Sequence, residues 1–533
     1  MKNMKKNSLL YILAGSIVTL ASCADFLDTM PDNRAEVNTE SKITNLLVSA
    51  YPSKTDVALT EMASDNAVDN GSRYSIEDKA QEEAYLWKDI TSTGNDSPKS
   101  YWDACYNAIA SANQALKAIE EMGNPANLQA QRGEALMCRA YGHFALANFF
   151  CLPYNPETAE HDLGIPYSDK PETEVAPSYQ RGNMKDLYAK INEDIEEALP
   201  LVNDAIYKVP KYHFNKKAAY AFAARFNLYY KKLDNVIKYA NVVLGAVPQK
   251  MLKNWYSIVI ESGTPNWDNR VDAYINASDP ANLLLLPVSS SWGYWGGPYD
   301  IGTRYGHSKD LCMVETGRAI GMWGNHQQLL PFKNVWGMDQ KFAVGKIGGY
   351  FFYTDKVNGI GYRKNVILTF SADETLLCRA EAYALKGMLN EATVDINSWL
   401  STHTRMFADP NKPTPGDVPL QVTTEEIVNF YKAIKCMPLD NSERTIKKEI
   451  NPIGFTLAEG DQKEIIQCIL HLRRIETIHE GLRWQDIKRY RIEISHNREG
   501  LTNDVLAADD PRRAFQLPAD VISAGLKANP RNK

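Results

Sequence analysis

The stretch that decides the fold is 101–122, which reads YWDACYNAIASANQALKAIEEM. Apolar residues recur in it every three or four positions, and Gly-Asn-Pro follows directly at 123–125. That spacing places the apolar side chains on one face of an α-helix, and the Gly-Asn-Pro sequence ends the helix. A second helix-forming stretch runs from about Leu128 to Phe150. The two stretches together predict a helical hairpin.

The same pattern recurs along the chain, and it predicts three further helix pairs: 184–199 with 216–231 (then a helix at 235–244), 372–386 with 391–400, and 463–479 with 483–489. In two of the second helices a small residue precedes an aromatic residue by four positions: Ala140 with Phe144, and Ala218 with Phe222. The small residue lets two helices approach closely, and the aromatic ring fills the space beside it, as in tetratricopeptide helix pairs. Ordinary packing in any helical protein is the alternative explanation.

The segment 247–361 differs from the helical parts, because it is rich in Gly, Pro, Trp and Tyr and has no helical periodicity. It holds six of the ten tryptophans: Trp255, Trp267, Trp292, Trp295, Trp323 and Trp336. We predict a loop-rich insertion with a few short strands on a mostly α-helical scaffold, and loops of this kind often carry functional residues.

The first residues predict export. Lys2, Lys5 and Lys6 precede a mostly apolar run from Ser8 to Ala21, which is too short to span a bilayer and typical of a signal peptide. It ends in Leu-Ala-Ser-Cys at 20–23, which resembles the lipobox of bacterial lipoproteins. The resemblance implies a signal peptide over 1–22, lipidation of Cys23 and a membrane anchor through the acyl chains. A plain secretory signal followed by a chance cysteine is the alternative.

Composition excludes some classes of function. The formal net charge is -6, and the expected signal peptide would remove three lysines and no acid, so the chain is a poor candidate for binding nucleic acid. The seven cysteines after Cys23 include no CxxC pair. We therefore expect few or no disulfides and no cysteine-based zinc site.

No catalytic motif stands out: the chain has no G-x-S-x-G, H-E-x-x-H, P-loop or G-x-G-x-x-G sequence. We predict no catalytic residues, no cofactor and no metal. A hydrolase that uses two carboxylates remains an alternative, because a chain with 65 acidic residues can hold such a pair, although no sequence pattern points to one.

The aromatic stretch Ser289 to Tyr299 is the best candidate for a ligand site, because its glycines would leave space beside the rings and sugar rings stack on aromatic faces. Sugar hydroxyls need polar partners as well. The candidates there are Trp292, Tyr294, Trp295, Tyr299, Asp300 and Arg304, then Trp323, Asn325 and Trp336, with Asp65, Asn66, Arg73, Tyr74 and Trp87 as edges from the N-terminal side. The alternative is that these rings pack in the core or against a partner.

Several motifs together resemble the SusD/RagB family of Bacteroidetes outer-membrane lipoproteins. They are CADFLD at 23–28, WDACYNAI at 102–109 with Ala112-Asn113, GEALMCRAY at 133–141, the helix 374–386, RRIE at 473–476 with EGLRWQDIKRY at 480–490, and Leu517-Pro518 with Asn529-Pro530. The order is kept from Cys23 to the C-terminus. The charged residues of 473–486 are spaced three or four apart, so we expect them to pair structurally, with Trp484 in the core.

The resemblance implies tetratricopeptide-like helix pairs that support a variable region. We expect a helical region over 23–246, the candidate ligand region over 247–361 and a second helical region over 362–533. It also implies a lipoprotein anchored in the outer membrane and exposed at the cell surface, which captures a glycan or oligosaccharide for a SusC-like TonB-dependent transporter. A scaffold that caps the transporter, or a subunit that binds peptide or glycoprotein, is the alternative.

Overall fold

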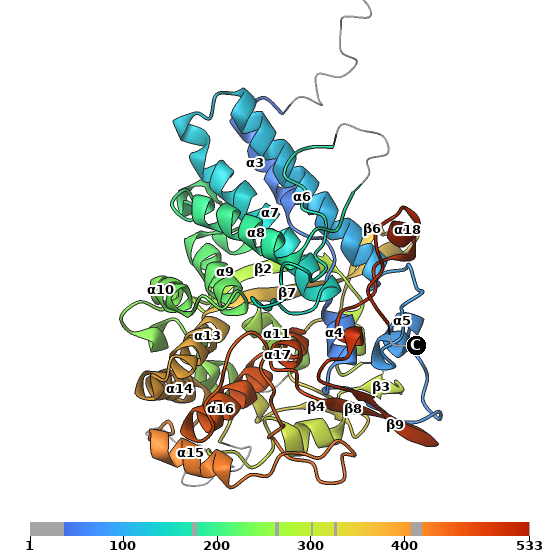
Figure 1. Ribbon diagram of the computed structural model, residues 1–533, viewed down its shortest axis with the longest axis vertical. Coiled ribbons are helices and arrows are strands. Elements are labelled where there is room, and N and C mark those ends of the chain that lie inside the picture. Colours follow the sequence, from blue (N-terminus) through green and yellow to red (C-terminus); the bar gives the residue numbers. More distant parts are fainter. Residues whose placement is uncertain are drawn as a thin grey trace, which may run out of the picture.

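The computed structural model of the chain describes residues 37–172, 179–261, 266–299, 302–324, 328–406 and 418–531. Figure 1 shows a mostly helical molecule, with helices stacked along one side and the strands gathered toward the other. The predicted functional residues Cys23, Asp300 and Asn325 lie outside the described residues. Within them, no helix is long and apolar enough to cross a membrane.

The predicted hairpin is confirmed as α6 (Pro98–Glu121) and α7 (Gln129–Phe150), which pack along each other. Ser97 begins α6 with a capping box, and Gly123, at φ 82°, follows its end. The two helices approach closely at Gly142, where a Cβ would lie 2.7 Å from the side chain of Ile109.

The second pair is different from the prediction. α8 (Met184–Ala198) packs on α7, whereas α9 (Lys216–Tyr229) forms a hairpin with α10 (Leu233–Leu244). The physical reason is the length of the connections, because three residues join α9 to α10 while a long segment separates α8 from α9. The small-plus-aromatic pattern nevertheless has a role, since the rings of Phe144 and Phe222 meet at 5.6 Å.

The C-terminal helices follow the same logic. α13 (Ala372–Leu385) and α14 (Leu389–His403) form the predicted third pair. α16 (Asp461–Glu476) packs mainly on α13 and α15 (Thr424–Lys432), and α17 (Leu482–Arg489) packs mainly on α4 (Val57–Ala63). The predicted fourth pair therefore exists as two helices, but each has another principal neighbour.

The segment 247–361 is loop-rich with short strands, as predicted. It supplies β2 and β6 to a three-stranded antiparallel sheet in the order β2-β7-β6, whose central strand β7 begins at Ile360, continues beyond the predicted boundary at 361 and leads directly into α13. The elements are α11 (Trp267–Tyr274), β2 (Asn282–Ser289), α12 (Trp292–Trp295), β3 (Tyr305–Gly306), β4 (Trp336–Met338), β5 (Lys341–Ala343), β6 (Tyr350–Asp355) and β7 (Ile360–Ser371).

The remaining α-helices and strands of the described residues are short. They are α3 (Glu40–Leu47), α5 (Lys79–Tyr85), α18 (Ala519–Ser523), β1 (Val68–Asp69), and the hairpin of β8 (Ile494–Arg498) with β9 (Leu501–Leu506). One large hydrophobic core joins residues from all parts of the described chain, including the predicted core residue Trp484, which is fully buried. The seven described cysteines are free thiols.

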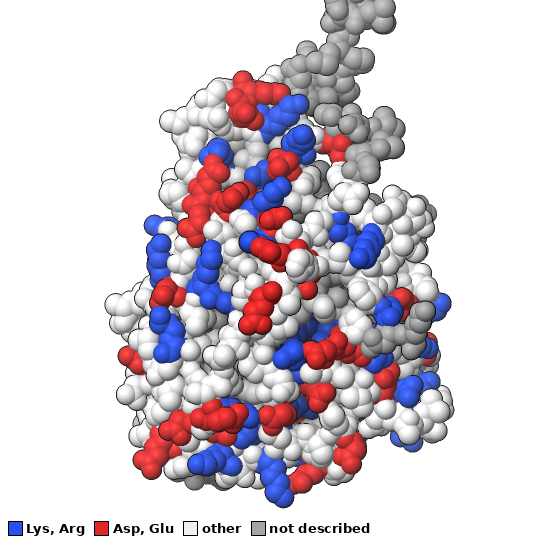
Figure 2. Space-filling model, viewed as in Figure 1, with Lys and Arg blue, Asp and Glu red and all other residues white. Residues whose placement is uncertain are grey.

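Charge is dispersed over the face that Figure 2 shows. Acidic and basic side chains alternate there, without an extended basic area.

Candidate functional site

Three tyrosines that reach solvent gather where α11, α12 and the β6–β7 hairpin meet. Tyr299 and Tyr350 are 38% and 37% exposed, and Tyr294 is half-buried. Two exposed carboxylates come from α11, and an exposed guanidinium comes from β7. We call this set the tyrosine surface: Asp268, Asp272, Tyr294, Tyr299, Tyr350 and Arg363.

Hydrogen bonds and ring contacts hold the tyrosine surface together. The hydroxyl of Tyr299 donates to Asp268 over 3.2 Å, and that of Tyr350 donates to Asp272 over 3.1 Å. The rings of Tyr294 and Tyr299 lie 5.9 Å apart, and the guanidinium of Arg363 lies 4.3 Å from the centre of the Tyr294 ring. The two aspartates are four residues apart on α11, so they lie on one side of the helix.

Glycines bring the elements together at this point. A Cβ at Gly293 would lie 2.3 Å from the carbonyl oxygen of Gly348, and one at Gly349 would lie 3.1 Å from the ring of Tyr294. Any side chain at position 293 would therefore push α12 away from the start of β6. The Gly-rich sequence around the rings thus positions Tyr294 beside the hairpin.

The electrostatics of the tyrosine surface suit neutral hydroxyl groups. Partial burial, and then the charge of the neighbouring aspartate, raises the pKa of both Tyr299 and Tyr350. Both phenols therefore stay protonated at neutral pH and donate to the aspartates. The carboxylates have lone pairs left to accept further hydrogen bonds, and the guanidinium of Arg363 lies over the ring of Tyr294 and forms no ion pair with a described residue.

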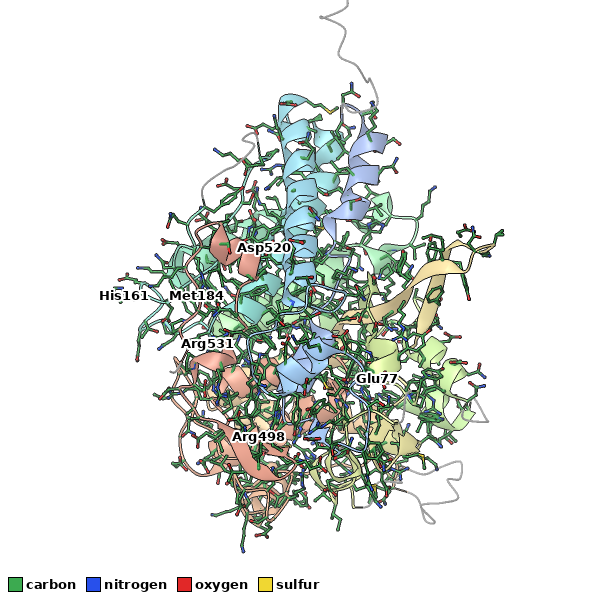
Figure 3. All side chains as sticks on the ribbon, turned by 90° about the vertical axis from the view of Figure 1, so that its right-hand side faces the viewer. Glu77, His161, Met184, Arg498, Asp520 and Arg531 are labelled. Atoms are coloured by element: carbon green, nitrogen blue, oxygen red, sulfur yellow. The ribbon has the colours of Figure 1, made fainter. Side chains whose placement is uncertain are left out.

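The β6–β7 hairpin next to this surface is unusually apolar. Figure 3 shows it projecting from the body of the molecule. Four of its exposed side chains are aromatic beyond Tyr350: Phe351, Phe352, Tyr353 and Tyr362, which are 41% to 49% exposed. Exposed aromatic groups in such a cluster are typical of a contact surface.

Most predicted tryptophans are not at the surface. Trp292 and Trp323 are fully buried, and Trp295 is 4% exposed. The predicted space beside the glycines is filled by the rings themselves: a Cβ at Gly296 would lie 2.6 Å from the ring of Trp292. Burial of a large ring removes it from water and stabilises the core, so these three side chains cannot stack on a ligand.

Trp87 is also a core residue. Its indole N–H donates to the carbonyl of Ala63 over 2.8 Å, and its ring stacks on His496 at 4.1 Å. Trp336 is half-buried and contacts Trp267 edge-to-face at 5.3 Å. Trp336 is thus the only tryptophan among the predicted and described ones that reaches solvent appreciably.

The polar candidates Asp65 and Asn66, from the N-terminal side, form buried structural contacts with arginines. Asp65 accepts two hydrogen bonds of 2.9 Å from Arg483, and Asn66 accepts one of 3.0 Å from Arg474. Burial alone would raise the pKa of Asp65, but Arg474, Arg483 and the nearby lysine hold it well below its usual value. The acidic ligand-edge role predicted for Asp65 therefore gives way to an ion-pair role.

Arg304 pairs in the same way with Asp69, over 2.8 and 2.9 Å. Arg73 is exposed and lies over the half-buried ring of Tyr74 at 4.8 Å. Neither pair contacts a residue of the tyrosine surface in any described interaction.

The charged C-terminal signature is structural, as predicted, but its partners are distant in sequence. Arg473 pairs with Asp486 at 3.0 Å and with Glu374 at 3.2 Å, and Arg489 pairs with Glu381. The arginines therefore join α16 and α17 to α13 across the core, and the expected pairing within one helix applies to Arg489 with Asp486.

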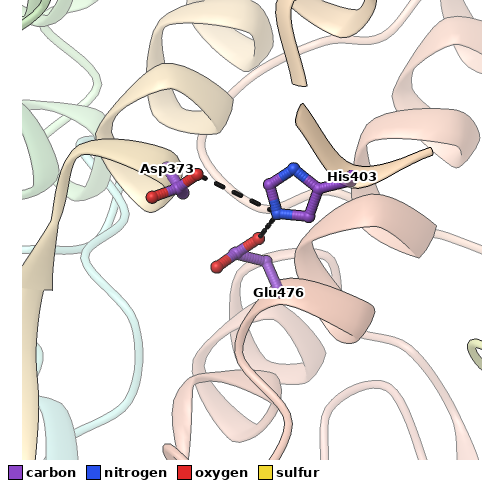
Figure 4. A group of neighbouring side chains, drawn as sticks. All are labelled: Asp373, His403 and Glu476. Atoms are coloured by element: carbon purple, nitrogen blue, oxygen red, sulfur yellow. Dashed lines mark hydrogen bonds and ion pairs between the residues drawn. The ribbon is translucent and has the colours of Figure 1, made fainter. Parts of the chain in front are cut away.

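One group within the described residues has the composition of a metal site: Asp373, His403 and Glu476, all buried (Figure 4). Nε2 of His403 lies 2.8 Å from Glu476 and 3.9 Å from Asp373. N–H donors already occupy this group, because Trp255 donates to Nε2 and Trp399 donates to Glu476, and the backbone N–H of residue 253 donates to Asp373. We interpret it as a buried polar network that joins α13, α14 and α16.

Several clefts are lined by residues outside the tyrosine surface. One of about 460 Å³ is lined by Tyr51, Tyr212 and Pro287, between α6 and β2. A smaller one of about 330 Å³ is more apolar and is lined by Trp102, Tyr106 and Leu526, between α6 and the C-terminal segment.

Tyr294 and Tyr299 were predicted from their sequence, whereas four other residues of the tyrosine surface were not: Tyr350, Asp268, Asp272 and Arg363. A signal was present for Tyr350, because the run Tyr-Phe-Phe-Tyr at 350–353 places aromatic residues on both faces of a strand, which a strand with one buried face does not do. The two aspartates carried only their four-residue spacing, which many exposed helices share.

These features define a class of protein: a scaffold of tetratricopeptide-like helices that supports a loop-rich aromatic region. Comparison with solved structures finds this fold over almost the whole chain. A SusD superfamily protein from Bacteroides thetaiotaomicron VPI-5482 superposes with a TM-score of 0.61 at 17% identity, over 92% of this chain and 99% of the other. A SusD superfamily protein from Bacteroides vulgatus ATCC 8482 gives a TM-score of 0.60 at 18% identity, over 92% and 98%.

A SusD-like carbohydrate-binding protein from Bacteroides vulgatus ATCC 8482 gives a TM-score of 0.58 at 15% identity, over 91% of this chain and 96% of the other. The SusD-like family model described as "Starch-binding associating with outer membrane" matches residues 25–228. No curated protein matches the chain. Residues 25–228 thus match a SusD-like family model, in agreement with the resemblance that the motifs show, and the solved structures share the fold over almost the whole chain.

Proposed function

We propose that the chain is a cell-surface lipoprotein that captures a glycan at the tyrosine surface and delivers it to a TonB-dependent outer-membrane transporter. The observation that carries the proposal is the meeting of three tyrosine rings with two carboxylates and a guanidinium on one exposed surface. The match of residues 25–228 to a SusD-like family model, and the carbohydrate binding named for one structural neighbour, support the same role.

The chemistry of the tyrosine surface fits a sugar better than a wholly apolar ligand. Aromatic rings offer flat faces for the C–H groups of a pyranose, and the carboxylates and Arg363 accept from or donate to its hydroxyls. The hydrogen bonds from Tyr299 and Tyr350 to α11 hold the rings in place before a ligand arrives. Less conformational entropy is then lost on binding.

The anchoring and delivery parts of the proposal come from the sequence. The Leu-Ala-Ser-Cys sequence would be the signal for lipidation of Cys23, and the acyl chains would tether the chain to the outer membrane, with the helical scaffold outside the cell. In this arrangement the chain binds and releases its ligand without breaking a bond, so we propose no catalysis.

Affinity electrophoresis of the chain from residue 24 onward tests the proposal. Wild type and a Tyr299→Ala, Tyr350→Ala variant migrate through gels that contain one polysaccharide each, and any gel that retards wild type is checked for released sugars. We expect retardation by one class of glycan, no product, and loss of retardation in the variant.

The control is a Phe351→Ala, Tyr353→Ala variant. These rings lie 4.8 Å apart on the same strand and alternate with Tyr350, so they point away from Tyr350, to the face on which Phe351 lies opposite Arg363. Retardation that survives in the tyrosine variant places the site elsewhere, and released sugars refute the non-catalytic role.

A second candidate function has an observation of its own. The projecting aromatic hairpin could contact the transporter, and the chain would then act mainly as a cap that closes it. In that case the Phe351→Ala, Tyr353→Ala variant loses the complex with the transporter, and no polysaccharide retards wild type.

A further inference from the structure

The inner side of α11 carries two buried hydrogen-bond donors without partners. Trp267 is 7% exposed and Arg270 is 4% exposed. The indole N–H of Trp267 and the Nη2 group of Arg270 are both buried, and neither has a hydrogen-bond partner among the described residues. A buried polar group that stays unpaired is costly, so each such group calls for an explanation.

The charge of Arg270 also lacks compensation. The other deeply buried arginines of the C-terminal network pair with carboxylates, as Arg473 and Arg489 do. Arg270 forms no ion pair with any residue that the structure describes, and burial alone lowers its pKa, to about 10. The guanidinium therefore stays charged at neutral pH without a counter-ion among those residues.

The local packing holds this arginine in position. A Cβ at Gly345 would lie 2.3 Å from Cγ of Arg270, so only glycine leaves room for the arginine stem. The guanidinium lies 5.8 Å from the centre of the Trp336 ring, and the same ring contacts Trp267. Trp336 is half-buried, so a partly exposed ring packs against both residues that carry the unpaired donors.

The unpaired donors adjoin the tyrosine surface through α11 itself. Trp267 and Arg270 lie three residues apart on the buried side of this helix, whereas Asp268 and Asp272 lie on the side that meets the tyrosines. One side of α11 therefore offers hydrogen-bond acceptors. The other side offers two unpaired donor groups, one on the cation of Arg270 and one on the indole of Trp267.

We propose that Arg270 and Trp267 form a subsite for an anionic substituent, so that the glycan captured by this chain is an acidic one. The inference rests on the proposed function for the glycan part, while the anion subsite stands on the two unpaired donors. The substituent enters where the Trp336 ring now lies, and its oxygens accept from Nη2 of Arg270 and from the indole of Trp267. The geometry of a guanidinium group suits the oxygens of a carboxylate and of a sulfate alike, so both substituents are tested.

Thermal unfolding in the presence of small probes tests the subsite without a known polysaccharide. Sodium glucuronate carries the carboxylate and methyl glucuronate masks it as an ester, while glucose 6-sulfate carries a sulfate and glucose carries neither. We expect the Tm of wild type to rise with glucuronate or with glucose 6-sulfate, and to stay unchanged with the two neutral sugars. Whichever anion acts identifies the source.

The decisive variant is Arg270→Met, which keeps the stem and removes the charge. Its Tm without ligand should equal or exceed that of wild type, because an unpaired buried charge is lost. The response to the anion should disappear, and retardation by an acidic polysaccharide should weaken about tenfold to a hundredfold. Arg498→Met, in the β8–β9 hairpin, is the control with the same charge change and should respond like wild type.

Each other outcome overturns the subsite. It fails if neither anion raises the Tm of wild type, if Arg270→Met responds as wild type does, or if that variant is strongly destabilised or unfolded, because Arg270 would then be a structural residue. Neutral glycans that are retarded through Tyr299 and Tyr350, without an anion effect, would leave the proposed function standing and refute this inference alone.

Discussion

Replacement of Asp65 by asparagine separates a structural role from the ligand role that its sequence position suggested. Asp65 accepts two hydrogen bonds of 2.9 Å from Arg483, and Arg474 and Lys448 lie 3.4 and 3.5 Å from its carboxylate. Asp65→Asn removes the charge at nearly constant volume. Of the described acids, Glu315 then remains to pair with these cations, at 3.2 Å from Arg474.

The expected loss follows from burial. Removing one member of a buried charge network leaves its partners unpaired and costs about 3–5 kcal/mol of unfolding free energy. Urea denaturation at pH 7, followed by tryptophan fluorescence, measures the loss as a lower midpoint with an unchanged slope. Asp509→Asn is the matched control: its partner Arg491 lies 2.7 Å away, but Asp509 is 83% exposed, so the loss should be below about 1 kcal/mol.

The difference in stability between wild type and Asp65→Asn should depend on pH, in a direction that the pKa of Asp65 defines. The cations hold the folded pKa of Asp65 well below its usual value, so its contribution is present above the unfolded pKa, about 3.9, and is lost as the pH falls. The gap between wild type and Asp65→Asn should therefore narrow in the acid range below about pH 4. A variant of near wild-type stability that no longer binds a glycan would refute this reasoning and return Asp65 to the ligand site.

Two further predictions follow from burial. Trp292→Ala should cost about 3–5 kcal/mol of unfolding free energy, measured by urea denaturation, because it leaves a cavity in the core. Glycan affinity per folded molecule should be unchanged. A variant with unchanged stability and lost affinity would contradict the burial of this ring. Burial raises the pKa of Glu480 to about 7, so the stability that its protonated form contributes is present below about pH 4.3 and is lost as the pH rises through 7. Glu480→Gln should remove up to about 3 kcal/mol of this pH dependence between pH 5 and 8, and parallel pH profiles for variant and wild type would contradict it.

The helices could be predicted from sequence because their signal is local. Apolar spacing and end signals such as Gly123 gave α6, α7 and α13 to within a few residues. The partner of each helix was harder to predict, because it depends on how the connecting segment runs. The three-residue link to α10 decides the partner of α9, and the position of α4 decides that of α17.

The candidate site was predicted only in part for a related reason. A tryptophan beside glycines has the same local sequence whether its ring faces solvent or fills the space that the glycines leave. The close approach of Gly296 to the ring of Trp292 shows that this ring fills the core, and no local sequence pattern predicts that contact. Tyr294 and Tyr299 were found, whereas Asp268 and Asp272 become partners of the tyrosines only when α11 folds against the hairpin.

The most direct test of the tyrosine surface is a crystal structure of the chain soaked with the glycan that affinity electrophoresis selects. The proposal predicts a sugar ring in contact with at least two of Tyr294, Tyr299 and Tyr350, with a hydroxyl bonded to Asp268 or Asp272. A glycan bound in the cleft lined by Tyr51 and Tyr212, with the tyrosine surface empty, would contradict it.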